Sequence, residues 1–268
     1  MPAQLHYTIY GKGHPVLLIH GFGADSRIWK YQIEFLQPHY QIIVPDLRGS
    51  GQSSSLSAPI SIEQLADDIL EILDEEKIFN CTVLGHSMGG YVTLALVEKQ
   101  PERFNAFGFI HSTSYADTEE KKLARTKSIE FIRENSAYDF LKITAPNWFS
   151  DTFKQNHPEV LSSFIDDGKE FSKDALIAYS NAMINRPDRT GVLQKANVPV
   201  LYFIGGEDKA VNPGDAITQS AIPALCKVKY LEGIGHMGML EATEELNHTL
   251  EDFLILVQQL ELEANLNN

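Results

Sequence analysis

The segment VLGHSMGGYV (83–92) places a single serine among three glycines. Its GHSMG stretch (85–89) matches the pattern G-x-S-x-G, with an apolar run before it and a helical pattern after it. At a sharp strand-to-helix turn the hydroxyl is exposed at the end of the sheet, and only small residues fit two positions before and two positions after it. We therefore predict that Ser87 is a nucleophile. The alternative is a glycine-rich turn in which Ser87 only caps the helix.

A serine hydroxyl is a weak nucleophile until a base accepts its proton. His236 follows the last predicted strand in a short glycine-rich loop, and Asp208 follows the strand before it. The carboxyl ends of parallel strands share one edge of the sheet, where active sites of such sheets lie, so both side chains should meet Ser87 there. Glu207 and Asp117 remain alternatives to Asp208 as the acid.

Acyl transfer also needs hydrogen-bond donors for the oxygen of a tetrahedral intermediate. The run LLIHGFG (17–23) ends a predicted strand, and its glycines let the loop curl and let a substrate approach. We predict that the backbone N–H groups of Phe22 and Met88 form this oxyanion hole and that Gly21 borders the substrate. Trp29, Tyr91 and Met237 are candidates for an apolar substrate pocket, with core packing as the alternative for each.

Three further histidines lie near the predicted site. His20 precedes the oxyanion glycine and His86 precedes the candidate nucleophile, so we expect both to shape the pocket floor by hydrogen bonding. His111 lies on a predicted strand and is interpreted as a core histidine.

The elements that must position these residues are short apolar runs alternating with helical patterns. The runs predict strands at 4–10, 15–20, 41–46, 81–86, 106–112, 199–206 and 227–233. Helical spacing predicts a helix at 62–73, opened by a capping box of Ser61 and Gln64, and a C-terminal helix at 246–257. Strands that are apolar on both faces and alternate with helices predict an α/β fold, a doubly wound and mostly parallel sheet.

Residues 113–190 interrupt this alternation. They contain no convincing strand, several helical segments and many aromatic residues. The chain is therefore predicted to consist of a sheet domain, residues 1–112 and 191–268, with a helical insertion at 113–190.

Five motifs occur in one order along the chain: LLIHGFG, VPDLRGSGQS, LGHSMGG, GGEDKAVNP and GIGHMGMLE. Together they resemble the α/β-hydrolase superfamily, and more narrowly its small capped serine esterases, over nearly the whole chain. The resemblance implies that Ser87 is the nucleophile, Asp208 the orienting acid and His236 the general base. It also implies that Phe22 and Met88 are the oxyanion donors, and that the helical insertion is a cap.

The activity that the resemblance implies is hydrolysis of small to medium carboxylic esters. The same triad also serves hydrolysis of C–C bonds, lactones or thioesters and acyl transfer. Some members of the superfamily instead bind a ligand without turnover.

The composition of the chain limits which ligands and partners are expected. The formal net charge of −14 disfavours nucleic acid phosphates and anionic membranes. The apolar runs are too short to span a bilayer, and no metal-ligand spacing, P-loop or dinucleotide fingerprint is present. We expect a small-molecule ester as substrate, no cofactor or metal, and a monomer or a homodimer. Two cysteines without a disulfide framework and an N-terminus without a secretory signal favour a cytoplasmic location.

Overall fold

The structure, a computed structural model, describes residues 5–53 and 59–266. Within these ranges the strands form one seven-stranded sheet in the order β1-β3-β2-β4-β5-β6-β7. The strands are β1 (Tyr7–Tyr10), β2 (His14–Ile19), β3 (Tyr40–Pro45), β4 (Cys81–His86), β5 (Phe104–Ile110), β6 (Val200–Gly205) and β7 (Cys226–Leu231). β1 is antiparallel to β3, and the other neighbouring pairs are parallel. The predicted strands are all present; 81–86 agrees with β4 at both ends, and the ends of the others are shifted. The first residue of the predicted strand 4–10 lies outside the described residues.

The central strands are buried on both faces, which explains their continuous apolar runs. Every residue of β4 is buried. Along β2, Leu17 and Ile19 belong to one hydrophobic cluster, whereas Val16 and Leu18 belong to a second. Because successive side chains of a strand point to opposite faces, the two clusters are the cores on the two sides of the sheet.

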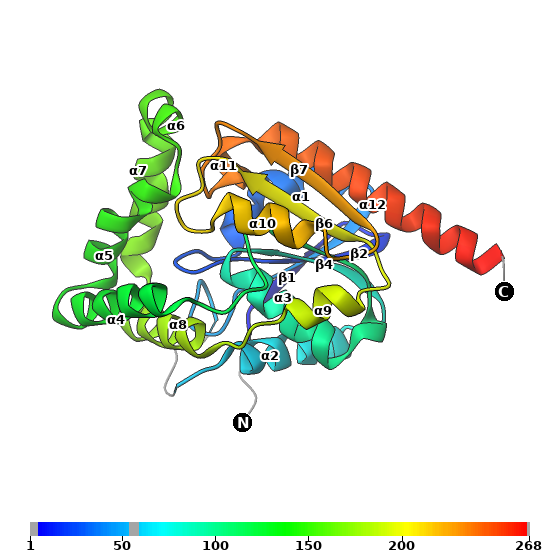
Figure 1. Ribbon diagram of the computed structural model, residues 1–268, viewed down its shortest axis with the longest axis horizontal. Helices are drawn as coiled ribbons and strands as arrows, with labels where there is room; N and C mark the ends of the chain where they lie inside the picture. Colours follow the sequence, from blue (N-terminus) through cyan, green and yellow to red (C-terminus); the bar gives the residue numbers. More distant parts are fainter. Residues whose placement is uncertain (1–4, 54–58, 267–268) are drawn as a thin grey trace.

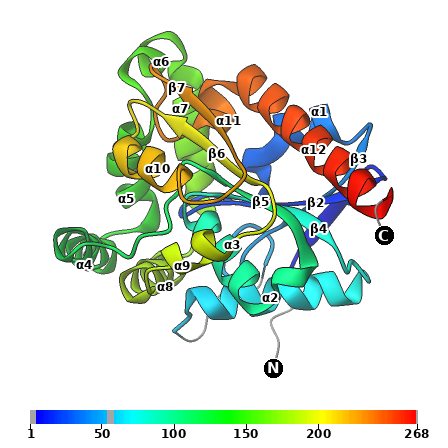
Figure 2. The ribbon, with the colours of Figure 1, turned by 45° about the vertical axis from the view of Figure 1, so that its right-hand side comes forward.

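Helices cover both sides (Figures 1 and 2). The first core includes side chains of α2 (Ile62–Glu75), α3 (Met88–Lys99), α9 (Thr190–Lys195) and α10 (Pro213–Ser220). The second includes side chains of α1 (Lys30–Leu36), α11 (Gly238–Glu241) and α12 (Thr243–Leu266). The capping box of Ser61 and Gln64 at the start of α2 is confirmed. α12 extends well beyond the predicted 246–257, because its last turns are exposed and carry no apolar repeat by which to predict them.

The chain between β5 and α9 forms α4 (Glu119–Glu134), α5 (Ala137–Thr144), α6 (Asp151–Asn156), α7 (Pro158–Asp167) and α8 (Lys173–Asn185). In both ribbon views these helices stand beside the sheet, on the side away from the end of α12 (Figures 1 and 2). Ile132, Phe140, Leu141 and Leu176 are part of a small core of their own. None of the helices in the described ranges is long and apolar enough to cross a membrane.

Candidate active site

Ser87 lies at the turn between β4 and α3 with a strained backbone. Its φ of 51° and ψ of −115° are unusual for a residue with a side chain, and such strain costs about 1–3 kcal/mol. The turn is held by the N–H of Ser87, which donates to the carbonyl of Ile110 at 3.0 Å. The Ser87 side chain makes no capping hydrogen bond to α3. The hydroxyl is therefore not used as a helix cap, and the alternative interpretation of this serine is wrong.

The glycines around Ser87 are required by close approaches of the backbone. A Cβ atom added to Gly85 would lie 2.3 Å from the carbonyl oxygen of Gly89, and one added to Gly89 would lie 2.3 Å from the carbonyl oxygen of Ile19. Non-bonded contacts of a Cβ atom are essentially never shorter than 3.0 Å. The turn therefore brings β4, the start of α3 and the end of β2 together only with glycine at both positions.

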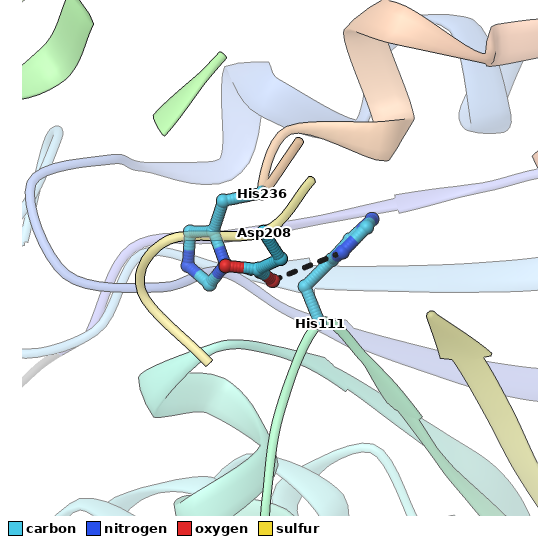
Figure 3. Close-up of side chains that lie close together, drawn as sticks. All are labelled: His111, Asp208 and His236. Atoms are coloured by element: carbon cyan, nitrogen blue, oxygen red, sulfur yellow. Dashed lines mark hydrogen bonds and ion pairs between the residues drawn. The ribbon is translucent and has the colours of Figure 1, made fainter. Parts of the chain in front are cut away.

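Asp208 and His236 form a hydrogen-bonded pair at the carboxyl ends of β6 and β7 (Figure 3). Nδ1 of His236 lies 2.8 Å from Oδ2 of Asp208. Oδ1 accepts from the backbone N–H groups of Ala210 at 2.8 Å and Val211 at 2.9 Å. These bonds fix the carboxylate, and they leave Nε2 of His236 as the ring nitrogen that can accept a proton.

A second histidine faces the same carboxylate oxygen. Nδ1 of His111 lies 3.3 Å from Oδ2 of Asp208 (Figure 3), and Nε2 of His111 accepts from the N–H of Gly238 at 3.2 Å. Because Nε2 is an acceptor, Nδ1 of the neutral ring carries the proton on the side of Asp208. His111 is fully buried, as expected for a core histidine, but its contact with the acid is a feature that the sequence did not indicate.

Among the residues that the structure describes, His111, Asp208 and His236 form a group that could hold a metal ion, since one ligand atom of each lies within 4.8 Å of the others. Nδ1 of His236 is hydrogen-bonded to Oδ2 of Asp208, and the protonated Nδ1 of His111 lies 3.3 Å from the same oxygen. A metal would require a free lone pair on these nitrogens. The arrangement therefore favours proton chemistry.

Burial and charge act in opposite directions on these groups. Burial alone would raise the pKa of Asp208, but the charge of His236 and the hydrogen bonds from His111 and His236 outweigh it and hold this pKa far below its ordinary value. Burial lowers the pKa of His111, and it lowers that of His86 further because His236 and His111 lie nearby. Asp208 is therefore ionised, whereas His111 and His86 stay neutral.

The loop that carries His236 is held on both sides. Its backbone N–H donates to the carbonyl of Trp148, a residue of the helical segment, at 2.6 Å. The carboxylate of Glu241 accepts from the N–H groups of Ser150 at 2.9 Å, Gly235 at 3.1 Å and Met237 at 3.1 Å. Glu241 thus ties the His236 loop to the helical segment above it.

A cavity of about 70 Å³ opens beside these residues. It brings together five of the residues predicted for the site, namely Phe22, Ser87, Tyr91, His236 and Met237. Oγ of Ser87 hydrogen-bonds no group within residues 5–53 and 59–266. Ser87 and His236 thus face a common space with the serine oxygen unengaged, and hydrogen bonds between such groups often tighten only when a substrate binds.

The oxyanion candidates lie against Ser87 from two directions. A Cβ atom on Gly21 would be 3.0 Å from Cβ of Ser87, so the loop that carries Phe22 is in contact with the serine turn. Met88 is the first residue of α3, and its side chain is fully buried in the core. Met88 and Phe22 can therefore contribute only backbone N–H groups and, for Phe22, the ring that lines the cavity.

The prediction for Trp29 is wrong. Its side chain is fully buried in the core between the sheet and helices α1 and α12, and it does not line the cavity of Ser87. Trp29 ends a short 3-10 helix, Ser26–Trp29, and faces that core. Core packing, the alternative interpretation, is therefore correct.

The rival acids lie elsewhere. Glu207 is exposed. Asp117 is buried and ion-paired with Arg125 at 2.6 Å and with Arg186 at 2.9 Å. Of the three carboxylates, only Asp208 is hydrogen-bonded to His236.

Residues that the sequence did not indicate complete the cavity wall. They are Ala24, Arg125, Trp148, Met183, Ala210 and Val211, and His86, which was expected at the pocket floor, lies beside them. Nε2 of His86 lies 3.0 Å from the carbonyl oxygen of His236, in line with the expected hydrogen-bonding role. Nε2 of His20 accepts from the N–H of Leu47, and its Nδ1 lies 2.9 Å from the carbonyl oxygen of Gly21. For the residues of the helical segment no sequence signal was available, since they carry no motif.

A larger cavity of about 340 Å³ lies between the loop at 23–31 and α7. It shares Ala24 with the smaller cavity but is lined by none of Ser87, Asp208 and His236. The candidate active site is therefore identified by the geometry of its side chains and not by the size of the cavity.

The comparisons with known proteins agree with this fold. The family described as the alpha/beta hydrolase fold matches residues 14–155, more than half of the chain. The chain belongs to the α/β hydrolase family. Among the relatives of this α/β hydrolase is 3-oxoadipate enol-lactonase 2 of Acinetobacter baylyi, 28% identical over 251 residues, which are 92% of this chain and 91% of the relative.

Solved structures show the same likeness. A thermophilic esterase from Thermogutta terrifontis, solved with malate bound, matches this α/β hydrolase with a TM-score of 0.91 and 27% identity over 95% of this chain and 94% of the esterase. The enol-lactonase from Burkholderia xenovorans LB400 matches with a TM-score of 0.87 and 24% identity over 94% and 97% of the two chains, a likeness of fold.

Proposed function

We propose that this α/β hydrolase cleaves carboxylic esters through Ser87, His236 and Asp208. The observation that carries the proposal is the Asp208–His236 hydrogen bond of 2.8 Å beside a cavity that both His236 and the strained Ser87 line. The relatives named as an esterase and an enol-lactonase support the same reaction class. A nucleophile, a base and an orienting acid are the parts that acyl transfer requires.

In the first half of the reaction, Oγ of Ser87 attacks the ester carbonyl while Nε2 of His236 accepts the serine proton. The negative charge on the carbonyl oxygen is met by the N–H groups of Phe22 and Met88, neither of which donates to a backbone carbonyl of the described residues. When the tetrahedral intermediate collapses, the bond to the alcohol breaks and His236 protonates the leaving oxygen. Asp208 stabilises the imidazolium that exists between these two steps.

In the second half, water attacks the acyl-enzyme. His236 accepts a proton from that water, the same donors hold the new oxyanion, and the proton returns to Oγ of Ser87 as the carboxylic acid leaves. The neighbouring His111, whose Nδ1 lies 3.3 Å from Oδ2 of Asp208, packs against the carboxylate from the other side and helps to keep it in place through both halves. The products are one alcohol and one acid per ester.

The helical segment 113–190 is proposed to act as the cap of this site. It supplies Arg125, Trp148 and Met183 to the cavity wall, and Trp148 also bonds the His236 loop. At about 70 Å³ the cavity is well below the roughly 300–1,000 Å³ of pockets for drug-sized ligands. The proposed substrates are therefore esters with short acyl groups.

A lactone is the second candidate substrate. A lactone is a cyclic ester, so its acyl and alcohol halves occupy one compact volume, which suits the small cavity. The relative named 3-oxoadipate enol-lactonase 2 supports this candidate. The steps above apply without change, except that the alcohol product stays attached to the acyl-enzyme.

A panel of p-nitrophenyl esters from acetate to palmitate tests the proposal. We expect kcat/KM to be highest for the shortest acyl chains and to fall for longer ones, because the extra methylenes meet the cavity wall. We expect no rise in rate above the critical concentration of the detergent. Best activity on palmitate would contradict the enclosed site, and no turnover of any ester or lactone would contradict the proposed function.

A further inference from the structure

Arg125 on α4 places a positive charge in the wall of the Ser87 cavity. Its Nε donates to Oδ2 of Asp117 at 2.6 Å, and its side chain is 20% exposed. None of the residues that line this cavity is an aspartate or a glutamate. Any substrate that reaches Ser87 therefore meets a guanidinium without meeting a carboxylate in the wall.

The charge of Asp117, the partner of Arg125, is already neutralised by a second arginine. Arg186 lies 2.9 Å from Oδ1 of Asp117 and is 3% exposed. It also donates to the carbonyl oxygens of Met183 at 2.7 Å and Tyr115 at 3.0 Å. Two guanidinium groups thus share one carboxylate, and the buried cluster carries one positive charge in excess.

Arg186 is fixed more firmly than Arg125. Its guanidinium lies 3.8 Å from the ring centroid of Tyr91, which itself lines the cavity. Arg186 is therefore held beside Asp117 by contacts within the protein, namely the two carbonyl oxygens and the ring of Tyr91. Arg125 is the arginine of this pair that reaches the cavity.

The donors of Arg125 are only partly used. A guanidinium has five N–H groups in a planar fork, of which Nε accounts for one. Across residues 5–53 and 59–266, Nη1 and Nη2 of Arg125 donate to no protein group. A fork of this kind matches a carboxylate, which can accept two parallel hydrogen bonds from it.

The surroundings add to the positive potential at this wall. Nζ of Lys121, one turn earlier on α4, donates to the carbonyl of Ala210 at 2.8 Å, and Ala210 also lines the cavity. The chain as a whole carries a net charge of −14, but the field of distant surface charges is screened within about 8 Å at physiological ionic strength. The distant surface charges therefore contribute little to the interaction with a bound substrate. The nearby Asp208 carboxylate is engaged by Ala210, Val211 and His236, whereas Arg125 offers donors that no group in the described ranges uses.

We propose that the ester substrate of this enzyme carries a carboxylate, and that Arg125 binds this carboxylate while Ser87 attacks the ester carbonyl. The inference rests on the proposed ester hydrolysis and adds the substrate class. Arg125 determines specificity by holding the anionic end of the substrate, and the Asp117–Arg186 pair holds Arg125 in place.

Matched esters test the inference, with the released acid followed by pH-stat titration in 0.15 M salt. Monomethyl succinate is compared with methyl 4-methylpentanoate, and O-acetylglycolate with isobutyl acetate. Within each pair the shapes agree and only one member carries the carboxylate, on the acyl side in the first pair and on the alcohol side in the second. We expect the wild-type kcat/KM to favour the anionic ester of at least one pair by about 10- to 100-fold, the range of a charge-assisted hydrogen bond.

The variant Arg125→Gln is expected to reduce that ratio to near 1, mainly through a higher KM for the anionic ester. Arg125→Lys is expected to keep part of the ratio, because the charge remains and the planar fork does not. Arg133→Gln on the exposed face of the same helix removes an equal charge and should leave the ratio at its wild-type value.

A wild-type preference for the neutral ester in both pairs would overturn the inference, even if Arg125→Gln does not fold. So would an unchanged ratio in Arg125→Gln. Both results would leave the proposed ester hydrolysis intact, whereas failure of the wild type on every ester would contradict the proposed function itself.

Discussion

The edge of the sheet and the helical segment over it contribute to the site in different ways. At the sheet edge, Gly85 and Gly89 have no space for a side chain, and the Asp208 carboxylate accepts hydrogen bonds from Ala210, Val211 and His236. In the helical segment, Arg125 has donors that no group of residues 5–53 and 59–266 uses. We therefore expect the sheet edge to fix the proposed reaction and the side chains of the helical segment to set the substrate.

The largest expected effect is at the sheet edge. Ser87→Ala removes the oxygen that forms the acyl-enzyme, and losses for such a residue are on the order of a million-fold in kcat. Ser163→Ala, in the larger cavity beside α7, is the matched control and should retain wild-type kcat/KM. Ester hydrolysis by Ser87→Ala at a rate close to wild type would show that the reaction is not placed at the sheet edge.

The choice of acid is tested by neighbouring residues. Asp208→Asn should lower kcat by about 10⁴-fold, because an amide favours the wrong tautomer of His236. Glu207→Gln changes the adjacent, exposed side chain and should have little effect. Steady-state kinetics on one short ester is sufficient, and the opposite ranking of the two variants would show that the acid is misassigned.

Two glycines contrast the packing at the serine turn with that of an exposed helix turn. Gly85→Ala should lower the free energy of unfolding by about 3 kcal/mol or more, since the new methyl group meets rigid backbone. Gly191→Ala, on an exposed turn of α9, should raise it by about 0.4–1 kcal/mol, because alanine restricts the unfolded chain. Urea unfolding of both variants measures the difference. Equal effects at the two positions would mean that the contrast in packing is not real.

A smaller effect concerns pH. Burial lowers the pKa values of His20, His86 and His111, so these groups bind protons more tightly in the unfolded chain. Their contribution to stability is fully present above the unfolded value of about 6.5 and is lost as the pH falls below it, by up to about 1.4 kcal/mol per pH unit for each group.

Urea unfolding at pH 7, 6 and 5 should therefore show a falling free energy of unfolding. His20→Gln, which keeps an acceptor for the N–H of Leu47, should reduce this slope, and His39→Gln on the exposed surface should not. Identical slopes for His20→Gln and the wild type would contradict a neutral, buried His20.

Much of the sheet edge could be predicted because its constraints act locally. The G-x-S-x-G pattern marks the turn at Ser87 through close backbone approaches that only glycine permits. Asp208 and His236 follow strands, and parallel strands bring their carboxyl ends to one edge. Their hydrogen bond and the antiparallel pairing of β1 required the structure.

The sequence was less informative wherever orientation depends on packing. Trp29 follows the oxyanion loop, but nothing in its neighbourhood indicates that its ring faces the core and not the cavity. His111 directly follows β5, has a positive φ of 53° and contacts Asp208, which no strand pattern could indicate. Arg125 reaches the cavity only because of the way α4 packs against α8 and the sheet domain.

Covalent labelling tests the central claim, that Ser87 is the nucleophile of this site, most directly. The protein is treated with a fluorophosphonate, and the intact mass and the peptide map are recorded together with residual activity on a short ester. We predict one phosphonyl group per chain, on the peptide that contains Ser87, loss of activity in proportion to labelling, and no label in Ser87→Ala. Labelling of another residue that persists in Ser87→Ala, with the ester still hydrolysed, would contradict the account.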